Sequence, residues 1–297
     1  MFVTRRVRPF VYFFLLLITS LLLTFTFART GISYSAEELI GGNIPQYQTA
    51  EEGEWIEMGS GSASGKGISK TSVFSMNPSL AIASDGTPVV AWRDDAGGNA
   101  EIYVRRWNGL SWEEMGNGSA SGAGISDTST LSLSPSLAIS PGSFPIIAWA
   151  DANDIGGSQE IYVRRWNGSS WVEMGTASAS GGGISNSMKS SRPSLAISPD
   201  GTPIIAWADS TSGNYEIYVR RWNGSSWVEM GSGSASGGGI SESSGYSSEP
   251  SLAIRPNGTP IITWADSTSG GFEIYVRRWL ADVTDFRLFL PSVLAKE

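Results

Sequence analysis

A motif repeated four times constrains the fold of this chain more than any other feature. Trp-x-Glu-Met-Gly begins at Trp55, Trp112, Trp171 and Trp227, so successive copies start 57, 59 and 56 residues apart. Each copy continues with a Ser/Gly-rich stretch, then Pro-Ser-Leu-Ala-Ile, a turn, an apolar run ending in Trp-x-Asp, and finally Glu-Ile-Tyr-Val-Arg-Arg-Trp. A period of this size is typical of architectures in which every repeat forms one supersecondary unit.

The residue pattern within one repeat predicts four short strands. In the third copy, Ser194–Ile197 is a short apolar segment followed by turn residues, and Pro203–Asp209 is an unbroken apolar run typical of a strand covered on both faces. Glu216–Trp222 alternates in part, which predicts a half-buried strand. Asn223-Gly224 then predicts a hairpin turn into a last strand over Trp227–Met230, since both residues accept positive φ.

Four antiparallel strands repeated at a fixed period predict the blades of a β-propeller. The first repeated element, Trp55–Met58, is an outer strand without inner strands before it, and the last, Glu273–Trp279, is a third strand without an outer partner. Pairing the two would close the ring, so we expect an all-β fold with one β-propeller of four four-stranded blades over 54–279. A solenoid is the rival architecture, but solenoid coils usually have shorter repeats of parallel strands.

The N-terminal residues 1–28 have the pattern of a secretory signal peptide. Three arginines precede an uncharged run over 9–27, and small residues lead to a cleavage point after Ala28. Cleavage near Ser35-Ala36 is one alternative. Retention as an uncleaved anchor is another, because the run approaches the roughly 17 to 25 residues that span a bilayer. Secretion or display at the cell surface is the expected location, with no membrane partner after cleavage.

Two further segments flank the predicted propeller. Residues 29–53 lack a strong period and are predicted to be a linker. Residues 280–297 form a C-terminal tail, read either as a strand-like segment against the disc or as a secretion address.

The composition excludes several classes of chemistry. The chain has no Cys and no His, which removes thiol nucleophiles, disulfides, Cys-type zinc sites and the usual general base. Its net charge is -8, which becomes -11 when the three arginines of residues 1–28 are removed. An acidic chain of this kind gives no support to nucleic acid as a partner.

The repeat motifs resemble those of secreted bacterial β-propellers of unassigned function. The resemblance rests on Pro-Ser-Leu-Ala-Ile, Gly-Thr-Pro-Ile-Ile-Ala-Trp and Tyr-Val-Arg-Arg-Trp-Asn-Gly-Ser-Ser-Trp, and it covers roughly Trp55 to Trp279. It implies a radial fold and an extracellular role. A weaker resemblance is to sialidase-type propellers with Asp-box turns, but Ser198-Pro199-Asp200-Gly201-Thr202 lacks their spacer and following aromatic, and no copy shows the unsymmetrical catalytic set of a sialidase.

Long loops on a rigid scaffold usually carry function, so we expect the site on the face that holds the second-to-third strand loops and the crossings between blades. Acids end the second strands there, and acids begin the third strands. Their oxygens suit Ca²⁺, with capping of the loop backbone as the alternative. The metal candidates are Asp209, Glu216, Asp266 and Glu273. The ligand-binding candidates are Arg192, Tyr246, Asp94, Asp151, Asp209 and Asp266.

The sequence thus predicts a secreted, non-enzymatic binding propeller with no catalytic residues. Four similar sites would gain avidity on a repetitive target, which favours a polysaccharide or a cell-surface protein as partner. The rival functions are a sialidase-like glycoside hydrolase and a structural component of the cell envelope. No cofactor is expected apart from the candidate Ca²⁺.

Overall fold

A computed structural model of the protein describes residues 25–26, 33–34, 53–152 and 159–280. The chain divides into two compact units, Met1–Ile56 and Glu57–Glu297. In the first unit, β1 (Phe25–Thr26) pairs antiparallel with β2 (Ser33–Tyr34). Apart from these two short strands, residue 53 and Leu280, the predicted signal peptide, linker and C-terminal tail lie outside the described residues. Within the described part of the chain, no helix is long and apolar enough to span a bilayer.

The second unit consists of strands that recur in the same order in every repeat. The first strands of the repeats are β3 (Ser75–Ile82), β7 (Leu131–Ile139), β11 (Ser190–Ile197) and β15 (Ser247–Ile254). The second strands are β4 (Pro88–Asp94), β8 (Pro145–Ala152), β12 (Pro203–Asp209) and β16 (Pro260–Asp266). The third strands are β5 (Glu101–Trp107), β9 (Gln159–Trp166), β13 (Glu216–Trp222) and β17 (Glu273–Arg278). The fourth strands are β6 (Trp112–Glu114), β10 (Trp171–Glu173) and β14 (Trp227–Glu229).

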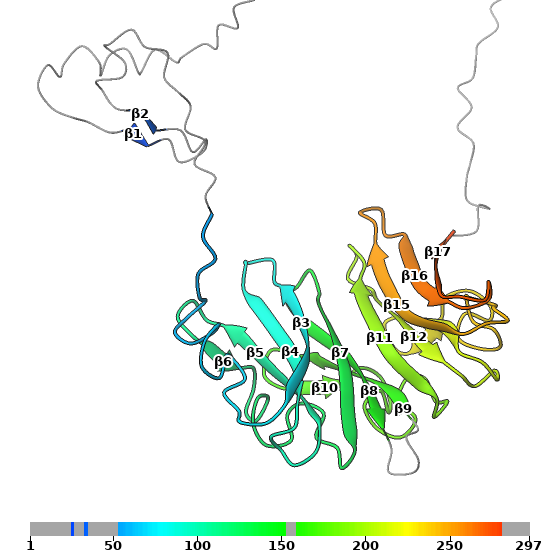
Figure 1. Ribbon diagram of the computed structural model, residues 1–297, viewed down its shortest axis with the longest axis horizontal. Coiled ribbons are helices and arrows are strands. Elements are labelled where there is room, and N and C mark those ends of the chain that lie inside the picture. The colour runs from blue at the N-terminus through cyan, green and yellow to red at the C-terminus, as the bar shows by residue number, and fades with distance from the viewer. Residues whose placement is uncertain (1–24, 27–32, 35–52, 153–158, 281–297) are drawn as a thin grey trace, which may run out of the picture. The chain divides into compact units, whose positions relative to one another are not determined.

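Each repeat forms one antiparallel sheet in which neighbours in sequence are neighbours in space. We name them sheet 1 (β3–β6), sheet 2 (β7–β10), sheet 3 (β11–β14) and sheet 4 (β15–β17). The sheets stack face to face in chain order, with the first strands β3, β7, β11 and β15 side by side along one edge of the stack (Figure 1). Small antiparallel sheets stacked about a common edge are the arrangement of β-propeller blades.

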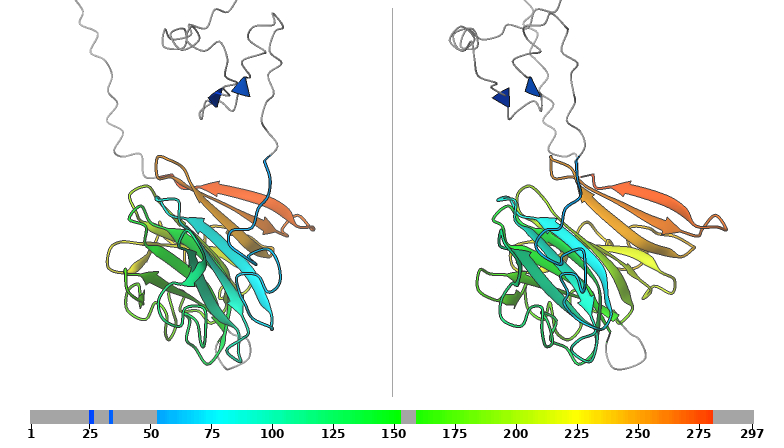
Figure 2. Two further views of the ribbon diagram at one scale, coloured as in Figure 1. Left: turned by 90° about the vertical axis from the view of Figure 1, so that its left-hand side faces the viewer. Right: turned by 60° about the vertical axis from the view of Figure 1, so that its left-hand side comes forward.

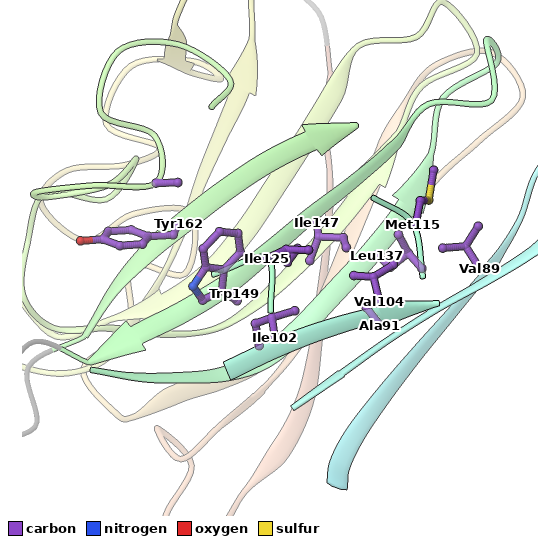
Figure 3. Close-up of a cluster of buried hydrophobic side chains, with 11 residues drawn as sticks. Val89, Ala91, Ile102, Val104, Met115, Ile125, Leu137, Ile147, Trp149 and Tyr162 are labelled. Atoms are coloured by element: carbon purple, nitrogen blue, oxygen red, sulfur yellow. The ribbon is translucent and has the colours of Figure 1, made fainter. Parts of the chain in front are cut away.

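The core lies between successive sheets. Between sheets 1 and 2, Ile102 and Val104 pack with Leu137, Ile147 and Trp149, as Figure 3 shows. Equivalent side chains pack between sheets 2 and 3 and between sheets 3 and 4. The second strands of the two middle sheets are covered on both faces. Every residue of β8 and β12 is buried, which confirms the prediction for β12 from its unbroken apolar run.

The closure predicted from the sequence is not formed in the structure. Sheet 4 has three strands, and Trp55–Met58 lies in no strand. Sheets 1 and 4 stand at the two ends of an open arc in Figures 1 and 2, and their end faces are exposed, with Leu80 62% and Val276 63% accessible. The reason lies in the three packed interfaces between the sheets, because they set a curvature that does not bring the two ends of the same chain together.

Candidate functional site

The first strand of each sheet carries a β-bulge. In β11 the register against β12 shifts between Ser191 and Ser194, and Arg192 at the bulge has φ of 52°. Asn77, Ser134 and Glu249 occupy the same place in the other sheets with φ of 51°, 51° and 55°. A left-handed backbone is uncommon for such residues, and bulges often lie beside functional sites, where they redirect a side chain. The bulge is therefore a constant feature of the repeat whose side chain differs in every copy.

Two further positions differ between copies and lie close to the bulge in the fold. One precedes the serine that pairs in register with the second-strand aspartate, and the other precedes the glutamate of the third strand. The residues at these positions are Phe74, Leu131, Lys189 and Tyr246, and Ala100, Gln159, Tyr215 and Phe272.

The variable positions of sheets 2, 3 and 4 come together around one groove. Its volume is about 310 Å³, and Gln159, Lys189, Arg192, Tyr215 and Tyr246 are among its lining residues. Gln159 and Lys189 also form an isolated parallel bridge between their sheets. We call this feature the aromatic groove.

Aromatic rings form one wall of the aromatic groove. The ring centroids of Tyr215 and Tyr246 are 4.6 Å apart, with planes inclined at 41°. Phe272 meets Tyr246 edge-on at 6.2 Å. Tyr246 remains 41% exposed, so part of its ring is open to a ligand. Partial burial raises the pKa of Tyr246, and the phenol is neutral at physiological pH.

The charged side chains at the aromatic groove are cationic or already paired. Lys189 is exposed, and Arg192 forms an ion pair of 3.0 Å with Glu249 of sheet 4. Both members of this pair are more than half exposed, so the pair contributes little to stability but holds the guanidinium at the rim. None of the residues that line the groove carries a carboxylate.

The aspartates that end the second strands lie away from solvent in hydrogen-bond networks. Asp209 is 0% exposed and accepts hydrogen bonds from the Ser187 hydroxyl (2.6 Å), the Ser190 hydroxyl (2.8 Å), the Trp207 indole (3.2 Å) and the Thr211 backbone (2.8 Å). The same Trp and Ser donors occur in sheets 1 and 2, at Asp94 and Asp151. Asp266 is bound by Ser247 and Thr268.

These donors control the protonation of Asp209 and Asp266. Burial alone would raise the pKa of Asp209, but hydrogen bonds from Ser187, Thr211 and Ser190 bring it below its ordinary value. The pKa of Asp266 is also lowered, because bonds from Ser247 and Thr268 outweigh the effect of burial. Asp209 and Asp266 are therefore ionised at neutral pH and hold the start of their second-to-third strand loops.

The glutamates that begin the third strands have a similar structural environment in sheets 1, 2 and 3. Glu216 lies opposite Asp209 in register and accepts a hydrogen bond from Ser241, whose oxygen in turn accepts the Ile217 backbone N–H at 2.7 Å. For the equivalent Glu101, burial outweighs the bond from Ser126 and raises the pKa. Glu273 lies opposite Asp266 in sheet 4 and is exposed.

The structure thus separates the residues singled out in the sequence into two groups. Arg192 and Tyr246 both line the aromatic groove, together with Tyr215, Lys189 and Gln159. The second-strand aspartates lie within the separate sheets instead. Within the described ranges, no group of three acidic side chains could hold a metal ion. Tyr215 and Gln159 were missed in the sequence, although their position varies between repeats just before a constant glutamate.

The sequence predicted calcium binding at Asp209 and Glu216, or at Asp266 and Glu273, and no observation of the described residues tests it. An ion at the first pair would have to displace hydroxyl and backbone donors that already satisfy both carboxylates. We therefore expect the same melting temperature in millimolar Ca²⁺ and in chelator. A higher melting temperature in Ca²⁺ for the parent, absent in Asp209→Asn, would instead reveal a calcium site, since a ligand bound only by the folded state stabilises it.

No family model and no curated protein matches the chain. Among solved structures, a protein of unknown function from Dyadobacter fermentans is 12% identical with a TM-score of 0.48, over 70% of this chain and 66% of that one. An alpha-L-arabinanase of Penicillium chrysogenum complexed with arabinobiose is 15% identical with a TM-score of 0.48, over 70% and 64%. TolB of Acinetobacter baumannii is 15% identical with a TM-score of 0.40, over 69% and 41%. The chain thus spans just under two thirds of the first two structures.

Proposed function

We propose that this protein binds a polysaccharide outside the cell, without cleaving it, and that the aromatic groove is the binding site. The observation that carries the proposal is the coincidence of the groove with the variable positions of the repeat. Strands, turns and buried networks recur in the copies, whereas side chains around the groove differ. Variable positions that gather at one place on a repeated scaffold are expected of a site selected for a ligand rather than for folding.

The chemistry of the aromatic groove suits a sugar polymer. The neighbouring faces of Tyr215 and Tyr246 offer flat apolar surface for the C–H faces of sugar rings, while their hydroxyls and Gln159 offer polar contacts. Lys189 adds positive charge at the rim of a chain whose net charge is -8, and the guanidinium of Arg192 beside it is paired with Glu249. A polysaccharide that carries carboxylates, such as a uronate polymer, is therefore the favoured class of ligand.

Hydrolysis by the usual mechanism of glycosidases needs two carboxyl groups on either side of the scissile bond. The aromatic groove has none among its lining residues. The buried acids Asp209 and Glu216 are already hydrogen-bonded to the hydroxyls of Ser190 and Ser241. This difference favours binding over the glycoside-hydrolase alternative. The residues of the groove also favour one main site on each chain rather than four equal ones, because sheets 1 and 2 have no tyrosine at the positions of Tyr215 and Tyr246.

Replacing Tyr246 by alanine is expected to weaken binding about tenfold or more, equivalent to about 1.4 kcal/mol, because it removes one wall of the groove. The measurement is retardation of the protein in gels that contain polygalacturonate, arabinan or xylan, followed by calorimetry with the polymer that binds best. Phe144→Ala is the matched control, since Phe144 is a 46% exposed aromatic residue in the turn between β7 and β8 and lies outside the groove.

Three outcomes would contradict the proposal. Equal retardation of the parent and Tyr246→Ala would place binding elsewhere. Release of reducing sugar from any of the three polymers would show an enzyme. Retention on a protein component of the cell wall, with no binding to the polymers, would show a protein ligand instead.

A further inference from the structure

The two ends of the arc expose apolar side chains that are buried at every other equivalent position. On β17 of sheet 4, Ile274 is 77% and Val276 63% exposed, whereas their equivalents in sheets 1, 2 and 3 are at most 2% exposed. On β3 of sheet 1, Leu80 is 62% exposed, whereas its equivalents in the other sheets are at most 9% exposed. Exposed apolar side chains that lie together on a folded protein mark an interaction site.

These two end faces are the two halves of one interface that the fold already uses three times. Between sheets 1 and 2, Ile102 and Val104 pack with Leu137. The same trio recurs in the next two interfaces, as Ile161, Val163 and Leu195, and as Ile217, Val219 and Leu252. Ile274 and Val276 therefore lack a leucine, and Leu80 lacks an isoleucine and a valine. The end faces are complementary because they belong to the same repeat.

A second observation concerns the segment that covers the third strand of each sheet. In sheet 1, Val104 donates its backbone N–H to Ser119 (2.7 Å), Ile125 donates to Ile102 (2.8 Å), and the Tyr103 hydroxyl donates to Gly122 (2.5 Å). Sheets 2 and 3 have the same cover. Among the described residues nothing equivalent covers β17. The matching segment, residues 57–69, precedes sheet 1.

The tryptophans at the two ends show the same complementarity. Trp222 in β13 packs on the outer-strand Trp227 with ring centroids 5.7 Å apart, and sheets 1 and 2 repeat this pair. Trp279 holds the corresponding place in sheet 4, against Gly231, with no described outer-strand tryptophan beside it. Trp55 is the outer-strand tryptophan of the repeat that lacks a sheet, and its side chain is fully exposed.

The same chain does not bring these ends together. Gly59 lies against Trp107, the carbonyl of Met58 accepts the Trp112 indole N–H at 2.9 Å, and both contacts fix this segment to sheet 1. Sheet 4 lies at the other end of the arc (Figure 1), beyond three interfaces built from fully buried side chains such as Trp149. Closing the arc on itself would require all three interfaces to repack, which close-packed interiors resist.

We propose that two copies of this chain close one ring head to tail, with sheet 4 of each copy packed on sheet 1 of the other. In each junction Ile274 and Val276 bury against Leu80 of the second copy. The N-terminal strand Trp55–Met58 of that copy becomes the fourth strand of sheet 4, and residues 59–69 cover β17. A two-fold axis makes the junctions identical and leaves no exposed strand edge at either end.

The first test is the mass in solution. By light scattering after size exclusion we expect twice the mass of one chain, and one chain mass for Val276→Asp, which places a charge in the junction. Val276 is exposed within a single chain, so this variant is expected to fold. The control Leu110→Asp changes an 87% exposed residue of the β5–β6 turn and is expected to keep the doubled mass. A single-chain mass for the parent, or assemblies without a definite mass, would overturn the two-copy ring.

The second test distinguishes closure between chains from closure within one chain. The protein has no cysteine, so single cysteines can be placed freely. By the register of Val228 opposite Arg221 in sheet 3, Ile56 would face Arg278 across the junction. Opposed residues on antiparallel strands are close enough for a disulfide.

Two differently tagged chains, Ile56→Cys and Arg278→Cys, are co-expressed and oxidised. We expect a disulfide between the two chains, seen as one covalent species that carries both tags. In the double variant we expect covalently joined pairs of chains. A double variant that forms its disulfide within one chain would show closure by one copy and overturn the proposal, as would the absence of any disulfide.

Discussion

Replacing Trp207 by alanine is expected to lower the free energy of unfolding by about 3 to 5 kcal/mol, the usual loss for a large aromatic side chain removed from a core. Trp207 is 0% exposed between sheets 2 and 3, in one cluster with Ile161 and Leu195. Its ring meets Tyr218 edge-on at 6.0 Å. The substitution would therefore leave a cavity in the interface and also remove the indole donor from Asp209.

The measurement is urea-induced unfolding followed by circular dichroism. Leu110→Ala, at a residue 87% exposed, is the control and is expected to change the free energy of unfolding by less than about 0.5 kcal/mol. A change of that small size for Trp207→Ala would contradict burial of this ring between the sheets.

The strands that carry the core could be predicted because their pattern is local. Pro203–Asp209 and Glu216–Trp222 have the predicted bounds of β12 and β13, and Asn223-Gly224 makes the hairpin to β14, with the Asn223 side chain accepting backbone N–H groups of Ser225 and Ser226. Burial on both faces and positive φ at glycine each leave a direct trace in the residue order. The half-buried strand predicted from partial alternation was wrong, because Glu216–Val219 of β13 are buried on both faces by the neighbouring sheets.

The environment of the acids could not be predicted in the same way. The sequence predicted the first strand from Ser194, but β11 begins at Ser190, because the bulge at Arg192 lets pairing continue past Pro193. These four residues bring Ser190 opposite Asp209. The bulge could not be predicted, because its residue is Arg192 and not a glycine. The hydrogen bond from Ser190 to Asp209 was therefore not expected, and the aspartates remained candidate metal ligands.

The aromatic groove is formed by side chains of different repeats. The repeat period in the sequence shows which residues are equivalent, but not which repeats come into contact. Tyr215 and Tyr246 are 31 positions apart and meet only because sheets 3 and 4 stack. The curvature of the stack has the same origin. Complementary ends could be read from Trp55–Met58 and Glu273–Trp279, but the side-chain packing at the three interfaces decides whether those ends meet in one copy.

Replacing Asp209 by asparagine is expected to lower the free energy of unfolding at pH 7 by about 2 to 4 kcal/mol, because charge-assisted bonds are lost and buried donors face an amide nitrogen that cannot accept. Three donors converge on one oxygen, Oδ2: the hydroxyls of Ser187 and Ser190 and the indole of Trp207. The Thr211 N–H binds the other oxygen. An asparagine can satisfy only one of these two sides.

The pH dependence separates this loss from a simple packing defect. Hydrogen bonds keep the pKa of Asp209 below its ordinary value, despite its burial, so the folded state favours the ionised form. The resulting stability is present above the unfolded pKa of about 3.9 and is lost as the pH falls through the lower folded value. Asparagine does not titrate there. The gap between parent and variant should therefore be widest near neutral pH and narrow below about pH 4.

The control for this comparison is Asp127→Asn, which removes the same charge from an exposed loop residue and keeps a residue type that tolerates the φ of 49° found there. Its unfolding free energy should follow that of the parent at every pH. If Asp209→Asn also does so, the carboxylate of Asp209 is not a structural acceptor. That residue would then be free for a ligand or a metal ion, as the sequence alone suggested.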